Sequence, residues 1–548
     1  MPARPIPSHV ASALVSVGIV ALALFSTVPG GRAATDAALA ERWLGHVKYL
    51  ASDAMRGRQT GSPEHRKAAD YVASRFRELG LAPAAGGGSY LQPVSFVTRR
   101  VREGAGGSSL ELVFADRIEP LVLGDDATLQ MSIEQADSLD APLVFAGYGL
   151  SVPEQGFDEL KQADLAGKIA VFIQGGPRIV SEPRRSQAQF AGERWARMKE
   201  AGAIGLITIR NPRRMDGTWE RGAAQRFTPG MSLADPAVDE RQGQLFGASL
   251  NAAHAEKLFA GSGHRFADLL ALADSEATLP IFPLVPRLRA RSRFDRRLVE
   301  SQNVVAVLPG RDARLKNEYV VLTAHLDHLG GGTPVAGDSI FNGAMDNASG
   351  VASLIEIARA LAPAAQRPRR SILFVCVTGE EKGLLGSYYY SRRPTVPAGA
   401  ITADLNVDMV LPIVPLKHLI VHGENESDLG VLARTEAEAV GIAVVPDPEP
   451  QRNLFIRSDQ FNFIRAGVPS VAFSTGAIQG SPEDSLLHAW IRNRYHEPSD
   501  DLDQPIDARA AADLIRYVTR LTARVANAPA RPRWNDTSFF KRYATPAP

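Results

Sequence analysis

The sequence predicts an α/β protein with a central mixed, mostly parallel sheet flanked by helices and a smaller, β-rich α+β domain inserted into it. Short apolar runs rich in β-branched residues recur along the chain, and patterns with helical spacing lie between several of them. Between residues 130 and 279 the pattern changes to strand-like segments that alternate with turns. Alternating strands and helices are typical of a sheet covered by helices. A chain of 548 residues also exceeds one ordinary hydrophobic core, so two or three domains are expected.

Residues 1–33 have the pattern of an export signal. Arg4 supplies a weak positive charge, residues 10–25 are apolar, and Gly31-Arg32-Ala33 offers small residues at the cleavage position. The apolar stretch is short for a membrane span, and no cysteine that could carry a lipid anchor follows it. We therefore expect a secreted or periplasmic protein with no stable membrane span in the mature chain. An uncleaved membrane anchor is the alternative.

Residues 34–129 are predicted to be the first part of the larger domain. They contain an amphipathic helix that stops at Gly80. Its apolar face consists of Ala68, Tyr71, Val72, Phe76 and Leu79.

The predicted insert, residues 130–279, separates this part from the second part of the larger domain, residues 280–525. Segments with strand or helix character follow one another in the insert, at residues 143–149, 168–173, 195–201 and 204–209. The larger domain resumes with an apolar run at 303–308. Residues 526–548 are rich in proline and arginine, and we expect them to form a loose C-terminal tail.

The composition is that of a globular protein, with 45% hydrophobic and 22% charged residues. The 61 Lys and Arg residues nearly balance the 60 Asp and Glu residues, so nothing indicates a nucleic-acid partner. The chain has one cysteine, Cys376, inside an apolar run. We expect it to be buried as a small apolar residue, and no disulfide can form within the chain.

Glu380 and Glu381 form an adjacent carboxylate pair just after the apolar run 372–377, in a turn flanked by glycines. Neighbouring side chains point in different directions, so one can bind a metal while the other handles a proton. Taken alone, such a pair is usually a solvated surface feature. Its meaning therefore depends on the residues at the ends of the other predicted strands.

Four further candidates lie at comparable places in the sequence. His325 follows the strand-like run 319–324, Asp346 lies at a predicted helix start, Asp408 follows the run 401–407, and His496 lies in a loop. Ligands of open α/β sheets bind outside the carboxyl ends of the strands. Five nitrogen and oxygen donors without a thiolate suit zinc first, and a shared carboxylate can hold two metals about 3.5–4 Å apart. Each residue alone has a structural explanation; their joint recurrence indicates a metal site.

These motifs resemble those of the M28 family of zinc peptidases, from about His46 to about Thr522. The resemblance implies two zinc ions and a role for each candidate. The implied zinc ligands are His325 and Asp408 for one ion, Glu381 and His496 for the other, and Asp346 as the bridge. Glu380 corresponds to the general base, and Asp327 to the acid that orients the imidazole of His325. The insert resembles a protease-associated (PA) domain.

The chain departs from the family pattern at two positions. The family usually has two consecutive aspartates at the bridging motif, whereas Met345 takes the first position here. Some relatives have a tyrosine where this chain has Phe455, so a phenol that could contact an oxyanion is missing. Nearby, Arg457 has two interpretations, a contact to a substrate carboxylate or a structural ion pair.

The resemblance implies an exported dizinc aminopeptidase that removes N-terminal residues from peptide or protein substrates, with a metal-activated water and Glu380 as general base. Three alternatives stay open. A glutaminyl cyclase of the same fold would use one zinc, and a carboxypeptidase would use Arg457 to bind the substrate carboxylate. A non-catalytic binding module is the third. The sequence does not determine the oligomeric state.

Overall fold

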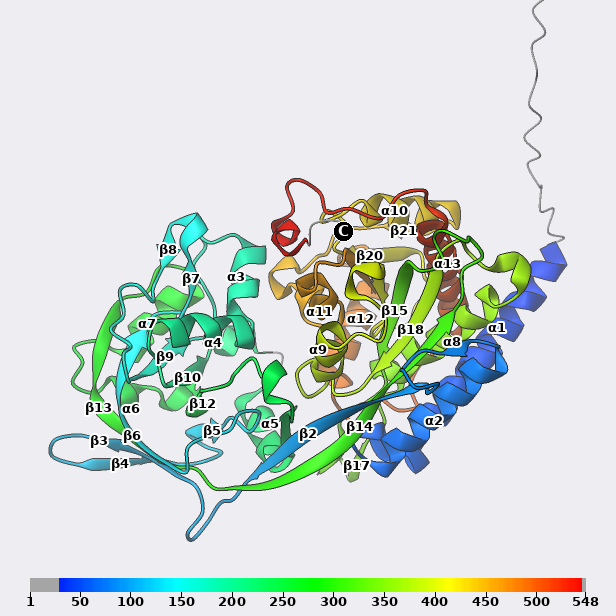
Figure 1. The fold of residues 1–548 in the computed structure, drawn as a ribbon. Helices are drawn as coiled ribbons and strands as arrows, with labels where there is room; N and C mark the ends of the chain where they lie inside the picture. Colours follow the sequence, from blue (N-terminus) through cyan, green and yellow to red (C-terminus); the bar gives the residue numbers. More distant parts are fainter. Residues whose placement is uncertain (1–28, 216, 545–548) are drawn as a thin grey trace, which may run out of the picture.

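The computed structural model describes residues 29–215 and 217–544, which fold into two lobes, each built around its own sheet (Figure 1). The expected signal segment, residues 1–33, lies almost wholly outside the described residues, which begin with helix α1 (Pro29–Leu50). Among the described helices, none is both long and apolar enough to cross a membrane.

The larger lobe contains a mixed sheet in the order β11-β2-β14-β18-β15-β19-β22-β20-β21. Its central strands are parallel: β18 (Ser371–Val377), β15 (Tyr319–His325), β19 (Ile401–Asn406) and β22 (Ser470–Gly476). Its outer strands are β11 (Gly230–Leu233), β2 (Leu91–Val101), β14 (Phe294–Leu308), β20 (His418–His422) and β21 (Ala443–Val444). Most outer pairs are antiparallel, so the expected mostly parallel pairing is correct only for the centre of the sheet.

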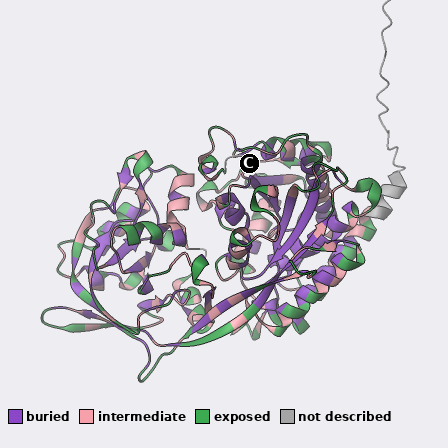
Figure 2. Ribbon diagram, viewed as in Figure 1, coloured by how far each residue is buried: buried purple, intermediate pink, exposed green. Residues whose placement is uncertain are grey.

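Helices cover both faces of this sheet, because its central strands are apolar on both sides. The first face packs against α1, α2 (Pro63–Glu78), α8 (Ser349–Leu361), α10 (Leu429–Ala439) and α13 (Ala508–Asn527). The second face packs against α9 (Leu385–Arg392) and α11 (Gln460–Arg465). Figure 2 shows the buried strands at the centre of the lobe and exposed residues on the outer sides of the helices. The sequence prediction of a helix around residues 68–79 is confirmed by α2.

The smaller lobe contains a second mixed sheet, in the order β4-β3-β13-β6-β9-β10-β12-β5. Its strands are β3 (Ser109–Val113), β4 (Ile118–Leu121), β5 (Ala127–Leu129), β6 (Ser138–Ala146), β9 (Ile169–Ile173), β10 (Gly205–Arg210), β12 (Phe246–Asn251) and β13 (Ile281–Arg291). Its helices include α3 (Glu182–Gln189), α4 (Ala191–Glu200), α5 (Trp219–Ala224), α6 (Glu256–Phe259) and α7 (Phe266–Asp274).

The sheet of the smaller lobe extends beyond the expected insert, residues 130–279. It draws β3, β4 and β5 from before this range and β13 from after it, because β4 pairs with β3, β3 with β13, β13 with β6, and β5 with β12. Conversely, β11 lies inside the range but pairs with β2 of the larger lobe. The long strands β2 and β14 pair along most of their length and run between the lobes at the bottom of Figure 1.

The C-terminal segment is not the loose tail that its composition suggests, at least as far as Ala544, where the described residues end. Trp534 and Phe540 are buried in an apolar cluster with Phe455, Ile456 and Phe461. The aromatic side chains provide the apolar area that the proline- and arginine-rich composition conceals.

Candidate metal centre

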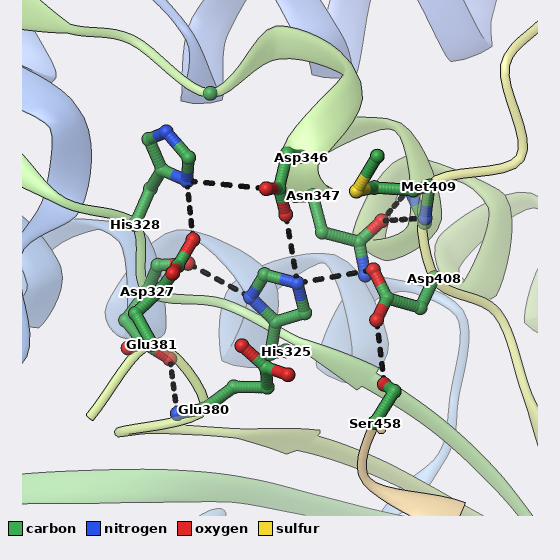
Figure 3. Close-up of polar contacts among 12 residues, drawn as sticks. His325, Asp327, His328, Asp346, Asn347, Glu380, Glu381, Asp408, Met409 and Ser458 are labelled. Atoms are coloured by element: carbon green, nitrogen blue, oxygen red, sulfur yellow. Dashed lines mark hydrogen bonds and ion pairs between the residues drawn. The ribbon is translucent and has the colours of Figure 1, made fainter. Parts of the chain in front are cut away.

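The five predicted ligands come together at the carboxyl edge of the larger sheet. His325 is the last residue of β15, Glu381 follows β18, and Asp408 follows β19. Asp346 lies in the irregular turn that leads into α8, and His496 lies in the loop after α12 (Pro482–Asn493). Neighbouring parallel strands end at the same edge, so these separate segments deliver their side chains to one place. Figure 3 shows His325, Asp346, Glu381 and Asp408 there.

Asp346 lies between two groups, each made of a histidine and a carboxylate. Its Oδ1 is 3.1 Å from Nε2 of His325, which in turn lies 3.1 Å from Oδ1 of Asp408. Its Oδ2 is 3.3 Å from Nε2 of His496, which lies 3.2 Å from Oε2 of Glu381. One carboxylate oxygen therefore faces each group, as a carboxylate shared between two metals requires.

The donor set fits zinc. The ligand atoms of His325, Asp346 and Glu381 lie within 4.8 Å of one another, and all are nitrogen or carboxylate oxygen. Oε1 of Glu381 is buried, and Nδ1 of the equally buried His328 lies 2.7 Å from it. A cation would compensate this concentration of buried carboxylates, because a buried charge needs a partner.

The electrostatics pair the carboxylates with the imidazoles. Burial acts to raise the pKa of Glu381, but His496 and His328 outweigh it, and the pKa lies well below its ordinary value. Burial acts to lower the pKa of His496, but Glu381 and Asp346 outweigh it, and the pKa lies well above its ordinary value. The site therefore favours anionic carboxylates beside a protonated imidazole, and a metal bound there would take the place of the imidazole proton.

Glu380 differs from Glu381 in its surroundings. Its carboxylate lies beside His325 and outside the two histidine–carboxylate groups (Figure 3). Burial raises the pKa of Glu380 well above its ordinary value, and the neighbouring carboxylates add to this, while His325 opposes it. A carboxylate with a raised pKa is better suited than an ordinary one to accept a proton near neutral pH.

Asp327 does not orient His325 in the expected way. Nδ1 of His325 lies 3.0 Å from the backbone carbonyl oxygen of Asp327, not from its carboxylate. The carboxylate instead accepts hydrogen bonds from the Thr60 hydroxyl, at 2.8 Å, and from the backbone N–H of Glu380, at 3.2 Å. Asp327 thus fixes His325 through the main chain and fixes the turn that carries Glu380 through its side chain.

Two residues of the site escaped the sequence prediction. His328 is fully buried, and its Nδ1 lies 2.7 Å from Oε1 of Glu381 and 3.9 Å from Oδ2 of Asp346. Its position directly after His-Leu-Asp was a signal that could have identified it. Asp500 accepts hydrogen bonds from the backbone N–H groups of Met345, at 2.9 Å, and Asp346, at 3.0 Å. It lies in an irregular C-terminal loop, and its sequence context gave no sign of this contact.

The residues that depart from the family pattern lie outside the two histidine–carboxylate groups. Met345 is buried in the core of the larger lobe. Phe455 packs edge to face against Phe540, with the ring centroids 5.2 Å apart. Near it, the hydroxyl of Ser458 donates to Oδ2 of Asp408 at 2.5 Å, which holds that carboxylate toward His325.

Three cavities adjoin the site; one of them, about 440 Å³, lies between the lobes and includes Ser132, Glu380 and Glu381 in its lining, and the other two differ in their walls. Of these two, the first, about 230 Å³, is lined by His325, Glu380 and Asp408 among other residues. Its apolar walls are Met409, Leu411, Ile420, Leu487 and Ile491. The second, about 500 Å³, lies between the lobes. Both lobes line it, the smaller with Ser132, Thr218 and Arg221 and the larger with Glu381, Lys382, Tyr495 and His496. Arg457 and His496 line both cavities.

Comparison with known proteins agrees with this geometry. Residues 303–522 match Peptidase family M28. This part of the chain is an M28 peptidase domain. It contains the five candidate ligands together with Glu380 and Asp327.

The chain is 28% identical over 272 residues to a "Probable zinc metalloprotease" of Pyrenophora teres f. teres, which covers 43% of this chain and 53% of the relative. It is 27% identical over 221 residues to "Aminopeptidase YwaD" of Bacillus subtilis, covering 39% and 43%. The chain thus spans about half the length of the curated relatives it matches.

Among solved structures, an aminopeptidase from Aneurinibacillus sp. strain AM-1 resembles this protein with a TM-score of 0.52 and 18% identity. The likeness covers 90% of this chain and 95% of that structure, and it concerns the fold alone.

Proposed function

We propose that this protein is an exported dizinc metallopeptidase that acts as an aminopeptidase. The observation that carries the proposal is the placement of Asp346, with one oxygen toward His325 and Asp408 and the other toward His496 and Glu381. This placement supports two metal positions that share one carboxylate. The family match and the zinc metalloprotease and aminopeptidase relatives support the same function.

His325, Asp408 and Asp346 would hold one zinc, and Glu381, His496 and Asp346 the other. Zinc bound there supplies a lowered pKa for a water molecule and polarisation of the scissile carbonyl. Glu380 accepts the proton of the attacking water and then donates it to the leaving amine. Asp327 holds the turn of Glu380 in place through the backbone N–H of that residue.

Aminopeptidase action is favoured over carboxypeptidase action by two considerations. Relatives named as aminopeptidases match the chain, and the cavity beside Glu380 has apolar side chains such as Leu411 and Ile420 in its lining, as a pocket for one substrate side chain would. A glutaminyl cyclase would need one zinc, whereas the donor set offers two positions. Arg457 keeps the carboxypeptidase alternative testable, because it lines both cavities.

We further propose that the smaller lobe is a PA domain that controls access of substrate to the site. The cleft between the lobes is lined by side chains of both, including Ser132 and Thr218 of the smaller lobe. A substrate that reaches His496 from this cleft would pass between the two lobes. Export of the protein, proposed from residues 1–33, is tested by locating the cleaved N-terminus of the protein from its natural source.

The decisive experiment combines metal counting with a substrate panel. We expect about two zinc ions per chain, loss of activity with a chelator, and recovery with added zinc. Free aminoacyl peptides should be hydrolysed, and peptides blocked at the N-terminus should not. Hydrolysis of N-blocked peptides with loss of activity on C-blocked ones would instead establish a carboxypeptidase. One zinc with transfer activity would establish a cyclase, and zinc binding without turnover a binding module.

A further inference from the structure

The loop that carries His496 has an unusual backbone. His496 has a φ of 56°, in the left-handed region that residues other than glycine seldom adopt. It follows α12, which ends at Asn493, and its ring stacks on that of Tyr495 with the centroids 3.9 Å apart. Such a conformation persists only where surrounding contacts hold it.

One of these contacts comes from the other lobe. Arg221 of α5 donates from Nη2 to the carbonyl oxygen of Tyr495, at 2.6 Å, and to that of His496, at 3.1 Å. The same nitrogen lies 3.0 Å from Oε1 of Glu497. A single guanidinium therefore contacts three consecutive residues of the loop, with His496 in the middle. Hydrogen bonds from a charged donor are stronger than those between neutral groups.

Arg221 is itself held in place within the smaller lobe. Its backbone N–H donates to the Thr218 hydroxyl, which caps α5, at 3.3 Å. The adjacent Trp219 donates from its indole to the carbonyl of Gly124, at 3.0 Å. The backbone of Arg221 is thus anchored in the smaller lobe, while the acceptors of its guanidinium belong to the larger lobe.

We propose that Arg221 is a positioning residue for His496, so that the smaller lobe completes one of the two metal positions. This inference rests on the proposed dizinc function. Because Arg221 bonds the backbone on both sides of the His496 α-carbon, its loss frees the loop and moves the imidazole away from Asp346 and Glu381. The metal position of His325 and Asp408 receives no such contact from Arg221 and is unaffected.

The test compares zinc affinity of the full-length protein and of Arg221→Ala by competition with a chelator. We expect the wild-type protein to release its two zinc ions over a similar chelator range. Arg221→Ala should hold one zinc as tightly as wild type and the other about 10–100-fold more weakly, the range typical of lost supporting contacts around metal ligands. Its rate on a small aminoacyl substrate, which does not extend into the cleft between the lobes, should fall at limiting zinc and be restored by excess zinc, with KM for that substrate unchanged.

Arg542→Ala is the matched control. Arg542 also bridges the lobes, through an ion pair with Glu154 at 2.9 Å. Both residues of this pair lie outside the loop that carries His496. Zinc release from this variant should equal that of wild type. In a His496→Ala background, Arg221→Ala should have no further effect on the remaining zinc, because the two residues act on one metal position.

Three results would overturn the inference. Arg221→Ala could release zinc as wild type does, it could lose affinity at both positions equally, or Arg542→Ala could weaken zinc binding to the same degree. The last result would mean that docking of the lobes matters in general and Arg221 has no special role. A wild-type protein that binds no zinc or hydrolyses no peptide would contradict the proposed function itself, which separates the two failures.

Discussion

At the residue scale, the adjacent pair Glu380 and Glu381 is divided into two tasks by its surroundings. Glu381 lies 2.7 Å from His328 and 3.2 Å from His496, whereas Glu380 lies outside these contacts. We expect Glu380→Gln to keep its zinc and lose about 10²–10⁴-fold in kcat, the usual contribution of a general base. Zinc content and steady-state kinetics of the same preparation measure both quantities.

The neighbouring substitution provides the comparison. Glu381→Gln should lower zinc content first and activity as a consequence, and excess zinc should restore part of the activity. A Glu380→Gln enzyme with near wild-type turnover, or one that loses its zinc, would show that the roles of the two glutamates have been assigned wrongly.

His328 is one of the two site residues that were not recognised from the sequence, and in the structure it lies next to Glu381 and Asp346. Its buried Nδ1 faces Glu381 and Asp346 at 2.7 and 3.9 Å. Removing it leaves Glu381 free to turn from the metal position, so His328→Ala should weaken zinc affinity by about 10–100-fold. Zinc titration against a chelator measures the loss, with His264→Ala on the exposed surface of the smaller lobe as control. If His328→Ala binds zinc with wild-type affinity, His328 has only a packing role.

Four of the five candidate ligands could be predicted because each follows an apolar run typical of a strand or lies at a predicted helix start, whereas His496 lies in a loop and was assigned from the family resemblance. The residues that hold them could not, because their partners are backbone groups from distant segments. Arg58, fully buried, donates to the carbonyls of Leu326, Asn342 and Gly343 at 3.1, 2.6 and 2.9 Å. An arginine in a polar, glycine-rich stretch carries no sequence signal of such a role.

At the scale of elements, α2 couples the stability of the larger lobe to pH. His65 in its first turn is buried, with Nδ1 3.1 Å from Nε2 of Gln302. Burial, assisted by the positive charge of Arg58, lowers the pKa of His65 to about 3. The unfolded chain takes up a proton below about pH 6.5 and the folded chain does not, so stability falls as the pH falls through this window.

The expected contribution is about 2 kcal/mol of unfolding free energy lost between pH 6.5 and pH 5, at 1.36 kcal/mol per pH unit. His65→Gln has no titrating group, so its melting temperature should fall less than that of wild type between pH 7 and pH 5. Thermal unfolding of both proteins at the two pH values measures the difference. Equal decreases in the two proteins would refute the assignment to His65.

The central strands could be predicted from the sequence and the outer pairing could not. The run at residues 372–377 is apolar throughout, and the run at 319–324 is apolar except for Thr323, as is typical of strands buried on both faces; both lie in the parallel centre. Strand β13 alternates buried and exposed residues and could pair on either lobe from its pattern alone. Its assignment to the smaller sheet depends on long-range partners, as does the pairing of β11 with β2.

At the scale of the whole molecule, the C-terminal segment links the two lobes on the side away from β2 and β14 (Figure 1). Tyr543 accepts a hydrogen bond from Gln187 at 3.1 Å, and Arg542 pairs with Glu154 at 2.9 Å. Together with Arg221 and the pairing of β11 with β2, these contacts hold the smaller lobe over the candidate site. The composition of the segment did not predict these contacts, because the few aromatic residues that anchor it are outnumbered by proline and arginine.

The placement of the lobes leads to a prediction about substrate length. Ser132 of the smaller lobe lines the cleft of about 500 Å³ that leads to Glu381 and His496. Ser132→Trp would fill part of this cleft without contacting the proposed metal ligands. We expect KM for peptides of several residues to rise by about tenfold, equal to 1.4 kcal/mol of binding. Small chromogenic aminoacyl substrates, which do not extend into the cleft, should keep their KM, and zinc content should not change.

Steady-state kinetics on a series of peptides of increasing length makes the comparison. If KM rises equally for all lengths, the substitution disturbs the site itself; if it rises for none, substrate does not pass between the lobes.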